Sequence, residues 1–217
     1  MTHAQQLISV YRQLDRHFGP LNWWPGETPF EVAVGAILTQ NTSWKNVETA
    51  IRRLKNADLL TPQALQNAKE QEVALLIRPS GYYNLKTKRV KNFVGFLMDT
   101  YNGSMSRMFQ EDMWPLRRNL LEIKGIGEET ADSILLYAGN KPIFVVDAYT
   151  RRIFTRHGIP MDTWKYGEIQ TLFMQYLPEE VGVYNQYHAL IVNAGKHYCR
   201  KIPVCEQCPL QDMKRRQ

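Results

Sequence analysis

The chain has 217 residues, of which 44% are hydrophobic and 22% charged, so it is long and apolar enough to fold into one large or two small globular domains. This balance excludes a disordered chain, and the formal net charge of +6 favours a polyanionic partner. No apolar run approaches the ~18 residues of a membrane-spanning helix, and Met1–Gln6 has no signal-peptide pattern. We therefore expect a cytoplasmic protein with no membrane partner.

Helical periodicity dominates the chain. Apolar residues recur at steps of three and four from Leu7 to Phe18, and Gly19-Pro20 then ends the first predicted helix. Thr61-Pro62 has the cap and proline of a helix start. Similar stripes predict helices at residues 30–38, 47–54, 86–101, 114–121, 130–137, 148–156, 166–176 and 182–194. The one strand-like stretch, residues 143–146, is too short to build a sheet, so the sequence predicts an all-α protein.

Gly125 and Gly127 separate two of these predicted helices. A Gly-x-Gly turn lets backbone N–H groups face outward at the new helix start, where they can hold a phosphate. Asp147 follows the apolar stretch 143–146, with cationic residues close behind it. A phosphate-binding turn followed by one carboxylate at this distance is what an enzyme needs to attack a nucleotide while holding its backbone.

With these segments the chain resembles the helix-hairpin-helix DNA glycosylases of the endonuclease III superfamily. The resemblance implies an all-helical, two-lobed fold with the active-site cleft between the lobes. It also implies a monomer that binds double-stranded DNA containing a damaged base. A central domain would span residues 22–131 and end in the hairpin, residues 118–135. The second domain would join residues 1–21 to residues 132–217 and carry Asp147.

The resemblance gives Asp147 the catalytic role. Cleavage of an N-glycosidic bond builds positive charge on the sugar, and a fixed carboxylate stabilises that charge or activates water. Asp147 also suits the N-cap of the next helix, and both roles can hold together. Bifunctional relatives carry a lysine where this chain has Glu129, and a glutamate cannot form a Schiff base. Although Lys124, Lys141 or another amine could substitute, we expect a monofunctional glycosylase that leaves an intact abasic site.

Four segments resemble the 3-methyladenine DNA glycosylase branch of the superfamily: Trp23-Trp24-Pro25, Gly35–Thr42, Arg78–Asn84 and Lys124–Gly127. This likeness implies a base pocket built from Trp23, Trp24, Pro25 and Trp44, with Lys196 beside it through a looser match. Indole faces stack on flipped bases and attract cationic ones. Alkylated purines of the 3-methyladenine type are therefore the expected substrate, in base excision repair, and core packing is the alternative role of the tryptophans.

Gln40 and Tyr82 resemble the DNA-penetrating residues of the family, which fill the gap left by an extruded base. Their alternatives are a helix-terminal amide bonded to backbone and a half-buried anchor. In the hairpin, the resemblance implies DNA contacts by Gly125, Gly127, Glu129 and Thr130, and a monovalent cation held by carbonyls of the turn. The helix that follows Tyr82 carries four cationic residues, which could contact phosphates or form a solvated face: Lys86, Lys88, Arg89 and Lys91.

The three cysteines, Cys199, Cys205 and Cys208, lie close together, which argues for metal ligation in a reducing compartment and against a disulfide scaffold. Their spacing resembles the [4Fe–4S] loop of endonuclease III relatives, which uses four cysteines. The fourth would fall near Lys214. A cluster with this incomplete ligand set is the favoured interpretation, and zinc with His197 as fourth ligand or an empty loop are its alternatives.

Two other functions are compatible with parts of the sequence. An endonuclease III-like enzyme would excise oxidised or mismatched bases and cut the strand, but Glu129 and the tryptophans argue against it. A helix-hairpin-helix module could instead bind DNA without chemistry. Asp147 argues against this module, because a pure binder has no use for a carboxylate that faces a negatively charged partner.

Overall fold

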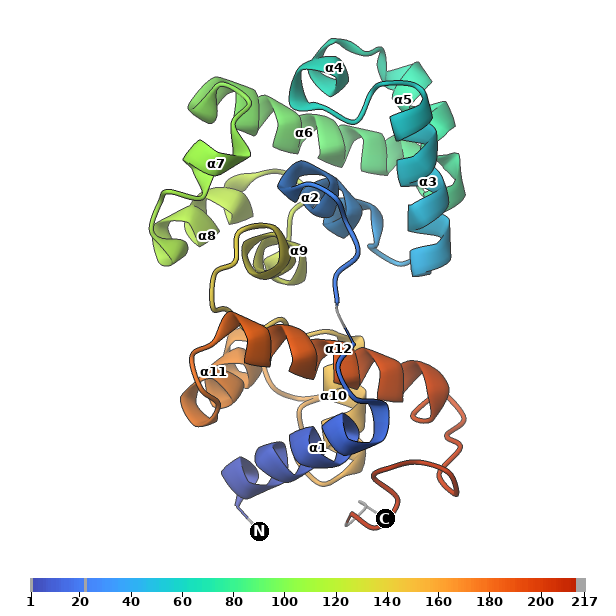
Figure 1. Ribbon diagram of the computed structural model, residues 1–217, viewed down its shortest axis with the longest axis vertical. Helices are drawn as coiled ribbons and strands as arrows, with labels where there is room; N and C mark the ends of the chain where they lie inside the picture. Colours follow the sequence, from blue (N-terminus) through green and yellow to red (C-terminus); the bar gives the residue numbers. More distant parts are fainter. Residues whose placement is uncertain (1, 22, 214–217) are drawn as a thin grey trace. The chain divides into compact units, whose positions relative to one another are not determined.

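The computed structural model describes residues 2–21 and 23–213 of the chain. These residues form helices joined by loops, with no strand among them, which confirms the predicted all-α class (Figure 1). Contacts divide the chain into a terminal unit, Met1–Trp24 with Pro142–Gln217, and a central unit, Pro25–Lys141. Asn22, where we predicted the central domain to begin, lies outside the described residues. No helix in the described ranges is long and apolar enough to cross a membrane.

The central unit is built around α2. Every residue of this helix except its first and third is buried, because the helix is apolar on nearly all sides. It packs against α3, α6, α9 and the π-helical turn η2, while α6 also packs against α4 and α5. The elements of this unit are α2 (Pro29–Leu38), α3 (Trp44–Asn56), α4 (Pro62–Asn67), α5 (Glu70–Leu76), the 3-10 turn η1 (Arg78–Ser80), α6 (Tyr83–Tyr101), α7 (Met105–Met108), α8 (Met113–Glu122), α9 (Glu128–Ser133) and η2 (Ile134–Ala138).

The terminal unit consists of α1 (His3–Phe18), α10 (Ala148–Arg156), α11 (Tyr166–Tyr176), α12 (Val181–His197) and a C-terminal cysteine-containing loop. Helix α12 packs against α1 and α10. The bounds of α10 and α11 are those that the sequence predicted, and α1 ends as expected at Gly19, whose φ is +68°.

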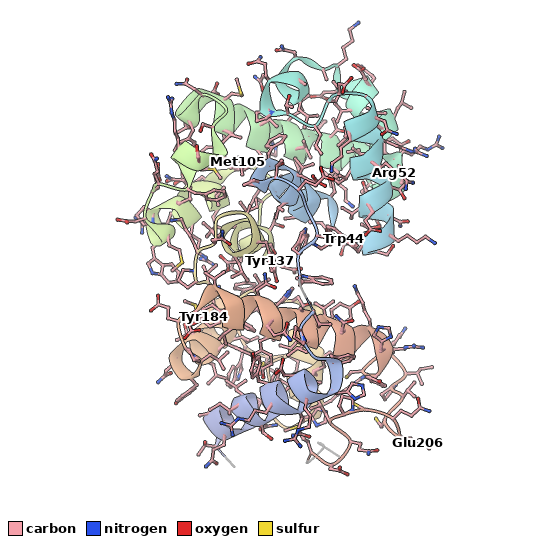
Figure 2. The ribbon with its side chains drawn as sticks, in the orientation of Figure 1. Trp44, Arg52, Met105, Tyr137, Tyr184 and Glu206 are labelled. Atoms are coloured by element: carbon pink, nitrogen blue, oxygen red, sulfur yellow. The ribbon has the colours of Figure 1, made fainter. Side chains whose placement is uncertain are left out.

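An aromatic cluster fills the core of the terminal unit. Phe144 stacks on Phe173 with ring centroids 4.0 Å apart and meets Tyr184, labelled in Figure 2, edge-on at 5.9 Å. Phe144 belongs to the strand-like stretch 143–146, which is a buried loop without strand pairing. Gln170 Nε2 donates to the Phe144 carbonyl at 2.7 Å, so this loop finds a polar partner inside the core. The packed loop therefore fixes the position of Asp147, the next residue along the chain.

Candidate active site and nucleic-acid interface

Asp147 begins α10 as its N-cap. Its Oδ1 accepts hydrogen bonds from the Thr150 backbone N–H at 2.7 Å and from Thr150 Oγ1 at 2.8 Å. The residue is 8% exposed. The capping role expected from the sequence is thus present, and it holds one carboxylate oxygen while the other is left to face other groups.

His188, in the middle of α12, faces this second oxygen. Its Nε2 lies 3.6 Å from Asp147 Oδ2, and both residues are buried. Burial is the main cause that lowers the pKa of His188; Lys196 adds to this effect and Asp147 opposes it. The sequence analysis missed His188, because a single histidine inside a periodic helix has the pattern of an ordinary core residue.

Lys196, near the end of α12, lies beside the tryptophan pair. Its Nζ is 5.3 Å from the centroid of the Trp23 ring, and the Trp23 and Trp24 rings meet edge-on with centroids 6.0 Å apart. Desolvation of the amine lowers the pKa of Lys196, and the nearby Asp147 carboxylate works in the opposite direction. The terminal unit therefore holds together four of the predicted site residues: Asp147, Lys196, Trp23 and Trp24.

The other two residues of the predicted pocket belong to the central unit. Trp44, labelled in Figure 2, is the first residue of α3, and its Nε1 donates to Glu48 Oε1 at 2.8 Å. Pro25 is exposed at the start of the unit. The structure therefore describes Trp44 and Pro25 within a different unit from the tryptophan pair.

The predicted hairpin is present as α8, a turn at residues 123–127, and α9. Gly125 has a φ of +99°, and a Cβ there would collide with Arg89 Cγ, so both backbone conformation and space require glycine. A Cβ on Gly127, the N-cap of α9, would meet open space. A partly buried ion pair joins the two helices, because Arg117 Nε and Nη2 donate to the two carboxylate oxygens of the buried Asp132 at 2.6 and 3.1 Å.

Gln40 is anchored to this hairpin. Its Nε2 donates to Thr130 Oγ1 at 2.8 Å and to the Gly125 carbonyl at 3.2 Å, and Arg89 Nη1 donates to its Oε1. The Gln40 amide thus braces the turn through a backbone contact and a side-chain contact, and its DNA-penetrating role stays a prediction. Thr130 is buried beneath it, whereas Glu129 is exposed in the first turn of α9.

The turn carbonyls that we expected to hold a monovalent cation already have hydrogen-bond partners. The Lys124 carbonyl accepts from Asn92 Nδ2 at 2.8 Å, and the Gly125 carbonyl accepts from Gln40. Each oxygen keeps a second lone pair for another partner. The cation stays a prediction from the resemblance.

Tyr82 differs from the buried candidate Thr130 in the exposure of its side chain. Its side chain is 72% exposed, although the ring is large and apolar. Its backbone lies in the left-handed region with φ at +46°, which is uncommon for a residue other than glycine and costs about 1–2 kcal/mol. An exposed ring on a strained backbone at the start of α6 favours a contact role over the half-buried anchor.

Most of the cationic side chains after Tyr82 are bonded within the protein, and they do not form the row of phosphate contacts that we considered. Lys86 is 1% exposed, and its Nζ donates to the carbonyls of Leu38 at 2.8 Å and Ser80 at 2.6 Å. Lys91 Nζ donates to carbonyls at the end of α4, and Arg89 is held by Gln40. Of the four residues, Lys88 alone is exposed, so the structure supports one surface cation in this row.

The three cysteines line one cavity of about 300 Å³ together with Arg156 and His157; His197 is not part of its lining. Arg156 Nη1 lies 3.2 Å from Cys199 Sγ, and its two Nη atoms also donate to the carbonyls of Arg200 and Lys201. Among residues 2–21 and 23–213, no three His, Cys, Asp or Glu side chains are placed to hold a metal ion. Lys214, at the expected fourth position, lies outside these ranges.

The donor set is thus three thiols where a [4Fe–4S] cluster takes four ligands. A shared cavity suits a cluster, but the described side chains alone do not complete its coordination. The cluster with an incomplete ligand set stays a prediction, and iron analysis decides it.

The sequence matches the family model of the HhH-GPD superfamily base excision DNA repair proteins over residues 34–179. A Methanocaldococcus jannaschii protein, whose name assigns it provisionally to the DNA repair glycosylases, is 49% identical over 210 residues, which cover 96% of this chain and 95% of the relative. Endonuclease III of Thermotoga maritima is 30% identical over 185 residues, which cover 85% of this chain and 81% of that enzyme.

Solved structures give the same result. The 3-methyladenine DNA glycosylase of H. pylori, solved with bound 1,N6-ethenoadenine, has a TM-score of 0.77 at 30% identity and covers 90% of this chain and 98% of its own. A non-covalent endonuclease III–DNA complex has a TM-score of 0.85 at 24% identity over 99% of this chain and 96% of its own, a likeness of fold.

Proposed function

Because this chain belongs to the HhH-GPD superfamily of base excision DNA repair proteins and is a DNA glycosylase of that family, we propose that it excises alkylated purines of the 3-methyladenine type by hydrolysis, without cutting the strand. The observation that carries this proposal is the fixed carboxylate of Asp147 in the same unit as the tryptophan pair and Lys196. The H. pylori 3-methyladenine DNA glycosylase, 30% identical to this chain, supports it as well.

Asp147 would act on the sugar of the extruded nucleotide. Departure of the base leaves positive charge on the sugar, and a carboxylate that needs no reorganisation stabilises that charge best. Thr150 supplies this preorganisation by holding Oδ1 with two hydrogen bonds. Alkylation at a ring nitrogen makes a purine cationic and its glycosidic bond weak, so one carboxylate would suffice without a strong acid directed at the base.

Hydrolysis without strand cleavage is proposed because of Glu129. This residue is exposed in the first turn of α9, where bifunctional relatives have a lysine, and its carboxylate cannot form an imine. Lys196 is an amine of the terminal unit that could substitute, since burial lowers its pKa and the Asp147 carboxylate acts on it. Borohydride trapping of wild type and of Lys196→Met therefore separates a residual lyase from a purely hydrolytic enzyme.

The preference for a cationic base is proposed from the tryptophan pair. The Lys196 ammonium already lies over the Trp23 ring, so this indole face can accept a cation. A cationic purine against Trp24 would gain stacking and roughly 1–2 kcal/mol of cation–π attraction. Trp24→Ala should then lower excision of 3-methyladenine more than excision of a neutral lesion such as hypoxanthine. An equal loss for both lesions would mean that the indole packs against the base without favouring a cation.

The test is incubation with separate duplexes that carry a methylated purine, an oxidised pyrimidine or a mismatch, followed by analysis before and after alkali. We expect release of the methylated purine, with strand breaks only after alkali and little borohydride-trapped adduct. Excision of oxidised pyrimidines with alkali-independent breaks would support the endonuclease III-like alternative. Binding with no base release from any duplex would support the non-catalytic module.

A further inference from the structure

Asp147 presents its two carboxylate oxygens to different partners. Oδ1 is held by Thr150 in the cap of α10. Oδ2 faces the Nε2 of His188 at 3.6 Å, which is slightly beyond a hydrogen bond but within ion-pair distance. Because α10 and α12 pack against each other, this approach is a feature of the core of the terminal unit.

Two charged groups act on the protonation of His188 in opposite directions. The carboxylate of Asp147 raises its pKa, and the ammonium of Lys196 lowers it. The guanidiniums of α10 are engaged elsewhere: Arg151 donates to the carbonyls of Met161 and Trp164, and Arg152 donates to those of Gly195 and Cys199.

Helix α1 also packs against α12, and three of its ionisable side chains contact other residues. Asp15 accepts from Gln186, His17 pairs with Tyr198, and Tyr11 meets the ring of Tyr187. The causes that shift the pKa of His188 are, largest first, burial, Asp147 and Lys196.

We propose that His188 is a positioning residue for Asp147: its neutral imidazole orients the second carboxylate oxygen, and its protonated form neutralises the carboxylate and switches excision off. This inference rests on the catalytic role proposed for Asp147. A neutral imidazole with hydrogen on Nε2 donates towards Oδ2 and adds no charge. An imidazolium at the same place forms an ion pair, so the carboxylate no longer offers its full charge to the sugar.

The direction of the pH dependence follows from the environment of the imidazole. Because burial lowers the pKa of His188 below its ordinary value of 6.5, the ring is neutral near neutral pH and Asp147 is free to act. As the pH falls through this lowered pKa, the ring gains a proton and excision falls. The acidic limb of the rate profile would then follow the protonation of His188.

The test measures single-turnover excision of 3-methyladenine between about pH 5 and pH 8, where an imidazole rather than an ordinary carboxylate changes charge. Wild type is compared with His188→Gln, which keeps an N–H donor but cannot take up a proton in this range, and with His188→Leu, which has neither property. His3→Gln is the matched control, because His3 is an exposed histidine of the same unit. DNA binding and the far-UV spectrum are recorded at each pH.

We expect His188→Gln to keep the wild-type rate at the alkaline end within about threefold and to lose the acidic limb. His188→Leu should also lack the acidic limb and be slower than His188→Gln by roughly tenfold at every pH. A common acidic limb in wild type and His188→Gln would overturn the proposal, as would equal inactivity of the Gln and Leu variants with normal DNA binding. If His188→Leu does not fold, the Gln comparison alone decides. Wild-type excision by Asp147→Asn would instead refute the catalytic assignment itself.

Discussion

Lys86 links the C-terminal end of α2 and the turn η1 to the start of α6. Replacing it with methionine keeps most of the unbranched apolar chain but removes the donor that both the Leu38 and Ser80 carbonyls use. Two buried acceptors then lose a partner, at about 1–3 kcal/mol for each unsatisfied group. Because Gln40 and Tyr82 follow these two carbonyls closely, we also expect weaker DNA binding by Lys86→Met.

Burial lowers the pKa of Lys86 from 10.5 to about 8. Between these values the unfolded chain binds more protons than the folded protein, so this lysine makes wild-type stability rise with pH. The difference between 10.5 and 8, at about 1.36 kcal/mol for each pH unit, corresponds to roughly 3 kcal/mol. The stability advantage of wild type over Lys86→Met should therefore be smallest below pH 8 and grow as the solution becomes more alkaline.

Urea unfolding of wild type and Lys86→Met at a series of pH values from about 7 to 10 measures this growth. Subtraction of the two curves removes the titration of other groups, such as Tyr101, whose pKa burial raises to about 12. Lys88→Met, on the exposed face of the same helix, should leave stability within about 0.5 kcal/mol of wild type at every pH. Parallel curves for wild type and Lys86→Met would refute the reasoning.

Three further predictions concern the hairpin, the cysteine loop and the DNA interface. Arg117→Met should lower the unfolding free energy by about 3–5 kcal/mol, because it leaves the Asp132 carboxylate buried without its ion pair, whereas Arg118→Met on the exposed face should be near neutral in a urea titration. The purified protein should be yellow-brown with several irons per chain; stoichiometric zinc would favour the mononuclear site, and absence of metal an empty loop. DNA affinity should fall steeply with salt, with about four to six phosphate contacts, and Lys88→Met should lower the slope by about one; a flat salt response would argue against DNA as partner.

Local signals were sufficient for much of the fold. Helix α10 could be located because Asp147 is a good cap residue and apolar spacing follows it. The hairpin could be located because Gly125 adopts a conformation that few residues other than glycine tolerate. Phe144 and its neighbours had the pattern of a strand because they are buried, but burial here comes from aromatic packing within a loop.

The burial and hydrogen-bond partners of the long polar side chains could not be predicted from the sequence. Lys86 and Lys88 are two positions apart on one helix, yet one is bonded inside the core and the other is exposed. The sequence offered Gln40 as a DNA-penetrating residue or as an amide bonded to backbone, but it could not show that the partner is the hairpin, which lies far along the chain. His188 meets Asp147 only because α12 packs on α10, and tertiary packing of this kind leaves no local pattern.

The central claim is that a carboxylate fixed at Asp147 drives hydrolytic excision of an alkylated purine. Its most direct test is the single-turnover release of 3-methyladenine from methylated duplex DNA by wild type and by Asp147→Asn, with DNA affinity measured in parallel. The asparagine keeps the shape and can still cap α10, so the variant should fold and bind DNA at least as well as wild type, and release should fall by at least about a hundredfold. Release by Asp147→Asn at close to the wild-type rate would contradict the account.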